Sequence, residues 1–341
     1  MWLGALFTST AANFGRLLIV GLLPNAILVA YVWVLVTIEA FTNNGPLLFP
    51  EALSNVRFKT DAGGLLMFAL LVITLTTVIQ PFQIRLVRIM EGYWRSRLGA
   101  FPYRAATAFH TRRRHRLRRV VNERIDSVDD ARLADMPIAE QIREQRRVRS
   151  QEMRLERAEA KLMAYPPGAE PVLPTMLGNT LRRNERVAGE RYALNTLRTW
   201  PRLYPLLNEK IAGEFDSDSD GVDASANLAV TFLIMSVLGF VAFVNDRWML
   251  LVPFTLLLLA VAAYRAAIAA AANQGVAMSV AYDLHRFDLL QSLHLGLPAT
   301  PKNEAARNRE LSHFFEISDG MPDPPSAEEH LNLNYVHPGR D

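Results

Sequence analysis

The chain has 341 residues, of which half are hydrophobic and a fifth are charged, and its formal net charge is +3. It contains no cysteine, which excludes disulfides, thiolate zinc sites, iron–sulfur clusters and a cysteine nucleophile. The hydrophobic residues are concentrated in four runs with charged segments around them, a pattern typical of a membrane protein rather than of an average soluble domain.

The first apolar run follows Arg16, and the segment before it, Met1–Gly15, carries no charged side chain. A secretory signal has a basic start and a small-residue cleavage site, so we interpret Leu17–Ile38 as an uncleaved membrane helix. Pro24 and Asn25 lie inside it. A proline in lipid frees a backbone carbonyl that a polar neighbour must satisfy. We therefore predict a kinked packing helix, and a polar point on a pore or substrate path is the alternative for Asn25.

The second membrane helix is predicted over Gly64–Phe82. Its second half is partly polar because it contains Thr74, Thr77 and Gln80. Threonines in membrane helices commonly bond their own backbone or join neighbouring helices, and a hydrophilic pore lining is the alternative. The pore-lining candidates of the chain are Asn25, Thr74, Thr77 and Gln80.

The clearest membrane signal comes from two apolar runs, Leu228–Val244 and Trp248–Ala263, which are separated only by Asn245–Arg247. Each is close to the roughly 20 residues that cross a hydrocarbon core. They predict a tight transmembrane hairpin. Helix-forming sequence continues from the fourth run to about Leu295, with Gly275 as its expected weak point.

The orientation follows from the arginines. Residues Ile84–Arg124 contain 12 arginines and only two acids, and arginine-rich flanks stay in the cytoplasm. Both termini are then cytoplasmic, and the neutral loops Phe41–Gly63 and Asn245–Arg247 lie outside. Nearly all basic residues are arginine, which indicates a GC-rich bacterial genome. With the four spans, this predicts a multi-pass protein of the bacterial cytoplasmic (inner) membrane.

The densest basic run is Arg112–Arg119, and three interpretations compete for it. It retains the membrane orientation or touches anionic lipid, it binds a nucleotide or oligonucleotide through phosphates, or it pairs with acids in an assembly. No aromatic residue interleaves the run, which weakens the base-stacking mode. The candidates for binding a ligand, phosphate or lipid are Arg112, Arg113, Arg114, Arg116, Arg118 and Arg119.

A polar helix is predicted over Ile138–Ala164. Val148, Leu155 and Leu162 are seven residues apart, but the complementary positions are mostly polar. The pattern therefore favours a solvated helix or a partial coiled coil. The segment Asp216–Asn227 begins like a calcium loop but lacks its final glutamate, so we predict a flexible hinge there.

After Pro174, Thr175 can cap a new helix that is predicted to run to about Arg198. This part of the chain contains Leu-Gly-Asn, Arg-Tyr and Trp-Pro-Arg-Leu motifs, at residues 177–179, 191–192 and 200–203. With the segments Glu91–Trp94 and Tyr282–Asp288, it resembles a group of bacterial multi-spanning membrane proteins. The resemblance covers most of the chain and implies a fold, but no activity is attached to these motifs.

No motif for catalysis is present: the sequence has no phosphate-binding glycine loop, no paired-histidine metal helix and no nucleophile elbow. His285 and Asp288, three residues apart on a predicted helix, are read as a surface pair, with a metal site or proton relay as the alternative. We therefore expect no enzyme, no cofactor and no metal.

Together these features predict an all-α polytopic membrane protein with four transmembrane helices. A helical cytoplasmic domain is built from the 84–225 insert and the extension of the fourth helix. Five divisions are expected: an N-terminal membrane pair (1–82), a basic cytoplasmic domain (83–225), a membrane hairpin (226–265), a cytoplasmic helical extension (266–315) and a disordered tail (316–341). The helical extension contains a last helix at Glu304–Phe315.

The predicted function is a homo-oligomeric, pore- or channel-like effector gated by its cytoplasmic domain. The alternative is a membrane-anchored scaffold that recruits a soluble cytoplasmic partner. The expected partners are the lipid bilayer, further copies of the chain, and a cytoplasmic protein or an anionic nucleotide ligand.

Overall fold

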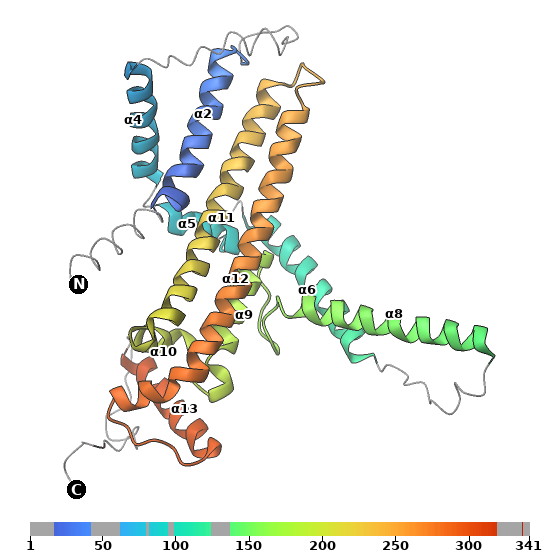
Figure 1. Cartoon of the computed structure of the whole chain (residues 1–341), viewed down its shortest axis with the longest axis vertical. Helices are drawn as coiled ribbons and strands as arrows, with labels where there is room; N and C mark the ends of the chain where they lie inside the picture. The colour runs from blue at the N-terminus through green and yellow to red at the C-terminus, as the bar shows by residue number, and fades with distance from the viewer. Residues whose placement is uncertain are drawn as a thin grey trace. The chain divides into compact units, whose positions relative to one another are not determined.

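The computed structural model describes residues 17–41, 62–79, 82–94, 99–123, 137–318 and 336. All of the regular secondary-structure elements in these ranges are helices, which confirms the all-α prediction (Figure 1). In chain order the elements are η1 (Leu17–Leu22), α2 (Leu23–Thr37), α4 (Ala62–Ile79), α5 (Gln83–Glu91), α6 (Ala100–Asn122), α8 (Ile138–Leu162), α9 (Met176–Val187), η3 (Glu190–Tyr192), α10 (Thr196–Leu203), η4 (Tyr204–Leu206), α11 (Glu209–Ala242), α12 (Leu251–Ser292) and α13 (Pro301–Ser318).

The chain divides into two compact units. Unit 1 comprises Met1–Met90 and Gly213–Gln274, and unit 2 comprises Glu91–Ala212 and Gly275–Asp341. Helices α11 and α12 each contribute residues to both units.

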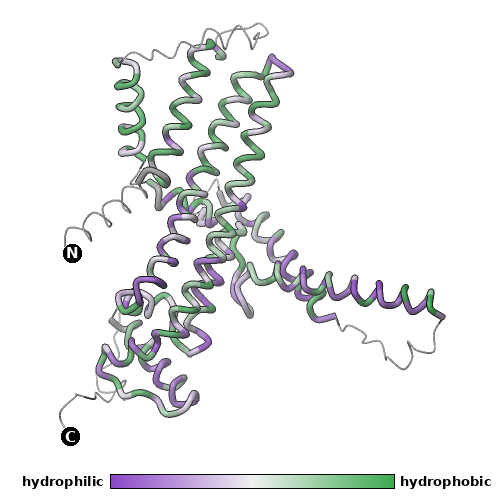
Figure 2. The backbone as a smooth tube through the Cα atoms, in the orientation of Figure 1, coloured by the Kyte–Doolittle hydropathy of each residue, from purple (hydrophilic) through white to green (hydrophobic). Residues whose placement is uncertain are grey.

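Unit 1 contains the predicted membrane helices. Helices α2, α4, α11 and α12 each hold an 18-residue stretch long and apolar enough to cross a membrane, and Figure 2 shows these stretches as hydrophobic. The prediction of four membrane-spanning helices is thereby confirmed in length and composition. Pro24 lies in the first turn of α2, directly after the π-helical turn η1. Because η1 continues into α2, Pro24 has no amide to donate to the carbonyl of Val20, four residues before it.

Helices α2 and α4 are joined by a polar contact within their apolar surfaces. The Asn25 amide nitrogen donates to the carbonyl of Gly21 at 2.9 Å and to Thr76 Oγ1 at 3.0 Å. The Thr76 hydroxyl donates in turn to the Val72 carbonyl at 2.7 Å. Both side chains are buried. An amide without these partners would be costly in lipid, so the contact specifies how α2 meets α4.

Helix α11 makes similar contacts. Asn227 donates to the Val20 carbonyl at 2.9 Å, and Ser236 donates to the Pro253 carbonyl at 2.8 Å. The first bond satisfies the carbonyl four residues before Pro24, which the proline leaves without its helical donor, and the second bond joins α11 to α12. Near the α11–α12 turn an apolar cluster forms from Leu35, Ala40, Phe243 and Met249.

The predicted hinge at Asp216–Asn227 is wrong. The segment lies inside α11, which is helical from Glu209 to Ala242. In unit 1, Gln274 donates to Ser219 Oγ at 2.8 Å, and a Cβ at Gly221 would meet Ala270 at 3.4 Å. This side of α11 is therefore held by contacts with α12, and Asn227 is buried and bonded to Val20. The small polar residues of this segment thus belong to a packed helix. A helical backbone also cannot wrap around calcium as a loop does.

In unit 2, Thr175 caps α9 as predicted, because its Oγ1 accepts from the amide of Gly178 at 3.1 Å. The helix ends at Val187 rather than near Arg198. The chain then turns through Ala193, whose φ is +60°, and α10 starts at Thr196. The Thr196 hydroxyl accepts from the Gly189 amide at 2.8 Å, which stabilises this turn against a continuous helix.

The part of α12 in unit 2 is the centre of the packing there. Tyr282 is fully buried; its hydroxyl lies 2.6 Å from Thr199 Oγ1 and donates to the Thr196 carbonyl at 3.0 Å. Gly275 is not a weak point, since α12 passes through it unbroken to Ser292. A Cβ there would meet the side-chain amide of Asn184 on α9 at less than 3 Å, so the glycine permits a close approach. The predicted helix at Glu304–Phe315 is confirmed as part of α13.

Candidate anion-binding groove on α6

Helices α6 and α8 pair side by side in unit 2. Arg154 on α8 lies 3.8 Å from Glu123 at the end of α6, while His110 in the middle of α6 contacts Tyr165 just after α8. These two contacts make the pair antiparallel. The covered positions of α8 alternate in steps of three and four, as in a coiled coil: they are Gln141, Glu144, Val148, Gln151, Leu155, Ala158 and Leu162. Helix α6 has the same spacing at Tyr103, Thr107, His110, Arg114, Leu117 and Val121, and other positions of α6 are covered as well. Helix α8 therefore has one covered stripe with exposed positions around it, which fits both predicted alternatives, a solvated helix and a partial coiled coil.

One stripe of α6 is bonded to the segment that follows α8. His110 Nδ1 lies 2.9 Å from the Tyr165 hydroxyl, Arg114 Nη1 donates to the Glu170 carbonyl at 2.8 Å, and Arg118 Nη2 donates to the Gly168 carbonyl at 2.6 Å. The three side chains are spaced four residues apart and so lie on successive turns. They fix the rotation of α6 about its own axis.

The stripe of His110, Arg114 and Arg118 is an unfavourable place for further positive charge. Burial lowers the pKa of His110, and the nearby positive charge of Arg113 lowers it further. Burial, together with the charge of Arg118, also lowers the pKa of Arg114. Only 6% of the surface of Arg114 is exposed, and its Nε has no hydrogen-bond partner among the described residues. A guanidinium in such a place is structural, because it is expensive to bury and is not open to a ligand.

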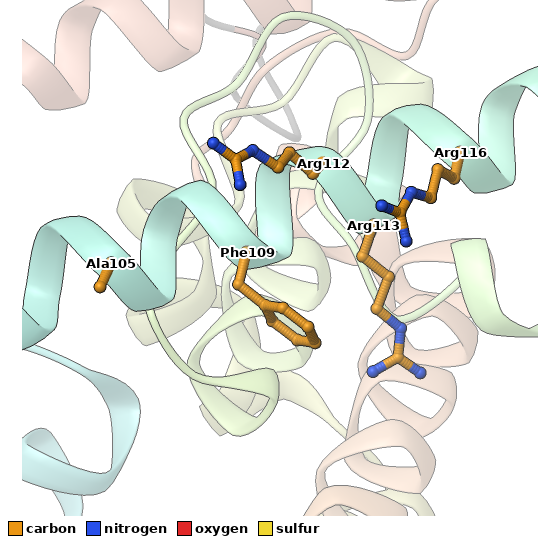
Figure 3. A pocket seen from close by; sticks show the side chains of 5 residues that line it. All are labelled: Ala105, Phe109, Arg112, Arg113 and Arg116. Carbon is orange, nitrogen blue, oxygen red and sulfur yellow. The ribbon is translucent and has the colours of Figure 1, made fainter.

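The opposite face of α6 carries a groove of about 420 Å³ (Figure 3). It is lined by Ala105, Phe109, Arg112, Arg113 and Arg116. At 3.6 residues per turn, positions 105, 109, 112 and 116 fall on one stripe, roughly opposite the bonded stripe. In Figure 3 the guanidinium groups of Arg112 and Arg113 project to different sides of the helix, and the Phe109 ring lies in the groove beside Arg113.

The structure therefore separates the six arginines that the sequence grouped together. Arg112, Arg113 and Arg116 line the groove, and none of the ion pairs found among the described residues involves them. Arg114 and Arg118 are bonded to backbone carbonyls. The sixth, Arg119, is exposed and does not line the groove.

Sequence reasoning missed Phe109 as a groove residue. It precedes the basic run by one helical turn, and its side chain is 58% exposed. The signal was present in the spacing of residues 105, 109, 112 and 116, which is the spacing of one helix face. Phe109 lies outside Arg112–Arg119, so the lack of aromatic residues within that run gives no sign of it.

The three pore-lining candidates that the structure describes, Asn25, Thr74 and Thr77, do not form one site in a single copy. Asn25 is buried and bonded to Thr76. Thr74 and Thr77 are exposed on α4, and the Thr77 hydroxyl donates to the Ile73 carbonyl at 2.8 Å. Gln80 lies outside the described residues.

A second polar cluster joins η3 to α12 in unit 2. Asp283 accepts from Arg191 Nη1 at 2.8 Å and from the Tyr192 hydroxyl at 2.7 Å, and Arg286 lies over the Tyr192 ring at 4.2 Å. Burial acts to raise the pKa of Asp283, but the hydrogen bonds from Tyr192 and Arg191 outweigh it and lower the pKa. The carboxylate is thus held charged by its partners, and its hydrogen bonds join η3 to α12.

The predicted His285 pair is also present. His285 Nδ1 lies 2.7 Å from Asp288 on the same helix, and its Nε2 lies 3.4 Å from the Asn208 amide. Both ring nitrogens therefore face protein groups, which agrees with a surface pair.

Comparison with protein families, with curated proteins and with solved structures finds no match for this chain.

Proposed function

We propose that the protein is a membrane-anchored scaffold whose unit 2 recruits an anionic partner in the groove on α6. One observation carries the proposal: Arg112, Arg113 and Arg116 line an open groove, whereas Arg114 and Arg118 of the same run are bonded to backbone carbonyls. The bonded pair holds the helix so that the other three guanidinium groups stay on the open side.

The charge of the three groove arginines and the fixed orientation of α6 both support the binding of an anion. A single exposed ion pair contributes about 1 kcal/mol or less, so one surface arginine would not make a site. Three guanidinium groups on neighbouring turns add their potentials and attract an anion before contact. Because α6 is fixed by its opposite stripe, less conformational freedom is lost on binding than on a free basic helix.

The membrane unit supports the role of an anchor. Among the described spanning residues, the polar side chains Asn25, Thr76, Asn227 and Ser236 are used in bonds within one copy. Such residues stabilise the packing of the helices, and they are not available to line a water-filled path.

The experiment is a binding titration of full-length protein in nanodiscs of neutral lipid, with fluorescently labelled inorganic polyphosphate as the probe. We expect binding that weakens as salt rises and that is lost in the triple variant Arg112→Gln/Arg113→Gln/Arg116→Gln. The matched control is Arg143→Gln/Arg146→Gln/Arg149→Gln, which removes the same charge from exposed positions of α8. Equal loss in both triple variants would refute the groove as the binding site.

A homo-oligomeric pore is the second candidate, and α4 favours it. Only 11% of its spanning stretch is covered, and Thr74 and Thr77 are exposed on it. A second copy packed on α4 would bring these hydroxyls to an interface. Mass measurement in detergent and ion flux in liposomes test this candidate; a strict monomer without flux would remove it.

A further inference from the structure

The groove on α6 has two chemically different ends. Ala105 and Phe109 make an apolar end, and Arg112, Arg113 and Arg116 make a cationic end one turn further along the helix. From residue 105 to residue 116 the helix rises about 16 Å, at 1.5 Å per residue. A ligand that fits this groove has an apolar part beside Phe109 and an anionic part beside the arginines.

The cationic end favours phosphate. Arginine presents a planar fork that matches phosphate oxygens with two parallel hydrogen bonds. In Figure 3 the guanidinium groups of Arg112 and Arg113 do not point to one spot but to different sides, with Arg116 beyond them. Spread donors of this kind suit an anion with several charged oxygens along its length better than they suit a single carboxylate.

The apolar end favours a flat ring. The Phe109 side chain is 58% exposed although it lies in the groove. Exposed aromatic rings beside a basic track are the platforms on which nucleic-acid bases stack. A volume of about 420 Å³ is within the range of about 300–1,000 Å³ that holds small ligands.

We propose that the groove binds a soluble nucleotide-like phosphate ester, with its ring on Phe109 and its phosphates between Arg112, Arg113 and Arg116. This inference rests on the proposed function, because it names the anionic partner of the same site. A membrane phospholipid shares the phosphate but carries no flat ring, so the two sources differ at the Phe109 end.

The test compares ATP, inorganic triphosphate and adenosine by calorimetry, with the full-length protein in nanodiscs of neutral lipid. We expect ATP to bind about tenfold more tightly than triphosphate, because a stacked base contributes a factor of that order, and adenosine to bind least. Phe109→Ala reduces ATP affinity to that of triphosphate and leaves triphosphate unchanged. The triple arginine variant loses both ligands, and the α8 triple variant keeps both.

Several results would overturn the inference. One is equal affinity of the unaltered protein for ATP and triphosphate; another is an unchanged preference for ATP in Phe109→Ala. If anionic phosphatidylglycerol in the nanodisc displaces ATP through the same arginines, the site belongs to a lipid headgroup. If polyphosphate binds but ATP shows no ring preference, the nucleotide is refuted and the scaffold proposal stands; if polyphosphate does not bind at all, the proposed function itself fails. Gel filtration and circular dichroism confirm that each variant is folded.

Discussion

Replacing Gly178 by alanine tests the close contact on which the start of α9 depends. An alanine Cβ at this position would lie 2.8 Å from the carbonyl carbon of Glu91 and nearer still to its oxygen. Carbon atoms in contact are separated by about 3.5–4.0 Å, so two backbone segments would have to separate by roughly 1 Å. The new methyl would also lie 3.0 Å from Thr175 Oγ1, the atom that caps the helix.

The magnitude follows from these contacts. Overpacking between rigid elements costs about 1–3 kcal/mol, and a disturbed cap costs about 1 kcal/mol more. Alanine returns up to about 1 kcal/mol through its higher helix propensity. We therefore expect Gly178→Ala to destabilise the protein by about 1–3 kcal/mol, seen as a lower Tm in detergent by circular dichroism.

Gly213→Ala is the matched control. Gly213 is also helical, but a Cβ there meets nothing within 4 Å, so the substitution should be neutral or stabilise by up to about 1 kcal/mol. Equal Tm values for Gly178→Ala and the parent would show that α9 and Glu91 are not in contact as described.

Three further predictions concern other contacts. Burial and a neighbouring arginine lower the pKa of His110 below its ordinary 6.5. The unfolded chain then binds a proton first as the pH falls, so stability is lost below about pH 6.5; in His110→Gln the fall in Tm between pH 7 and pH 5 should be smaller, and an identical pH profile would contradict this. Asn25→Ala should cost about 1 kcal/mol by removing the bond to Thr76, whereas Thr77→Val should leave Tm unchanged, and the opposite ranking would count against the α2–α4 contact. Tyr282→Phe removes two buried hydrogen bonds and should lower stability by about 1–3 kcal/mol, measured by the same Tm assay; a neutral effect would show that the hydroxyl is not bonded.

The membrane helices could be predicted from the sequence because their signal is one-dimensional. A run such as Leu228–Val244 is long and apolar enough by itself to identify a span, whatever it packs against. The polar helix α8 and the cap at Thr175 were also predictable, because both depend on residues that are near in sequence.

The groove could not be predicted, because the rotation of α6 depends on distant residues. Arg114 and Arg118 bond to Glu170 and Gly168, which lie 50 or more residues further along the chain. Without those partners, six arginines in eight positions look alike. The hinge at Asp216–Asn227 was wrong for a related reason, since local composition gave no sign of the contacts between α11 and α12.

We propose that four helices cross the membrane and leave the arginine-bearing unit inside the cell. The absence of cysteine from the chain allows a direct test with single-cysteine variants and a membrane-impermeant maleimide. Asn245→Cys, in the turn between α11 and α12, should be labelled in intact spheroplasts. Gln145→Cys, on the exposed side of α8, should be labelled only after lysis. Labelling of Gln145→Cys in intact spheroplasts, or protection of Asn245→Cys until lysis, would contradict the account.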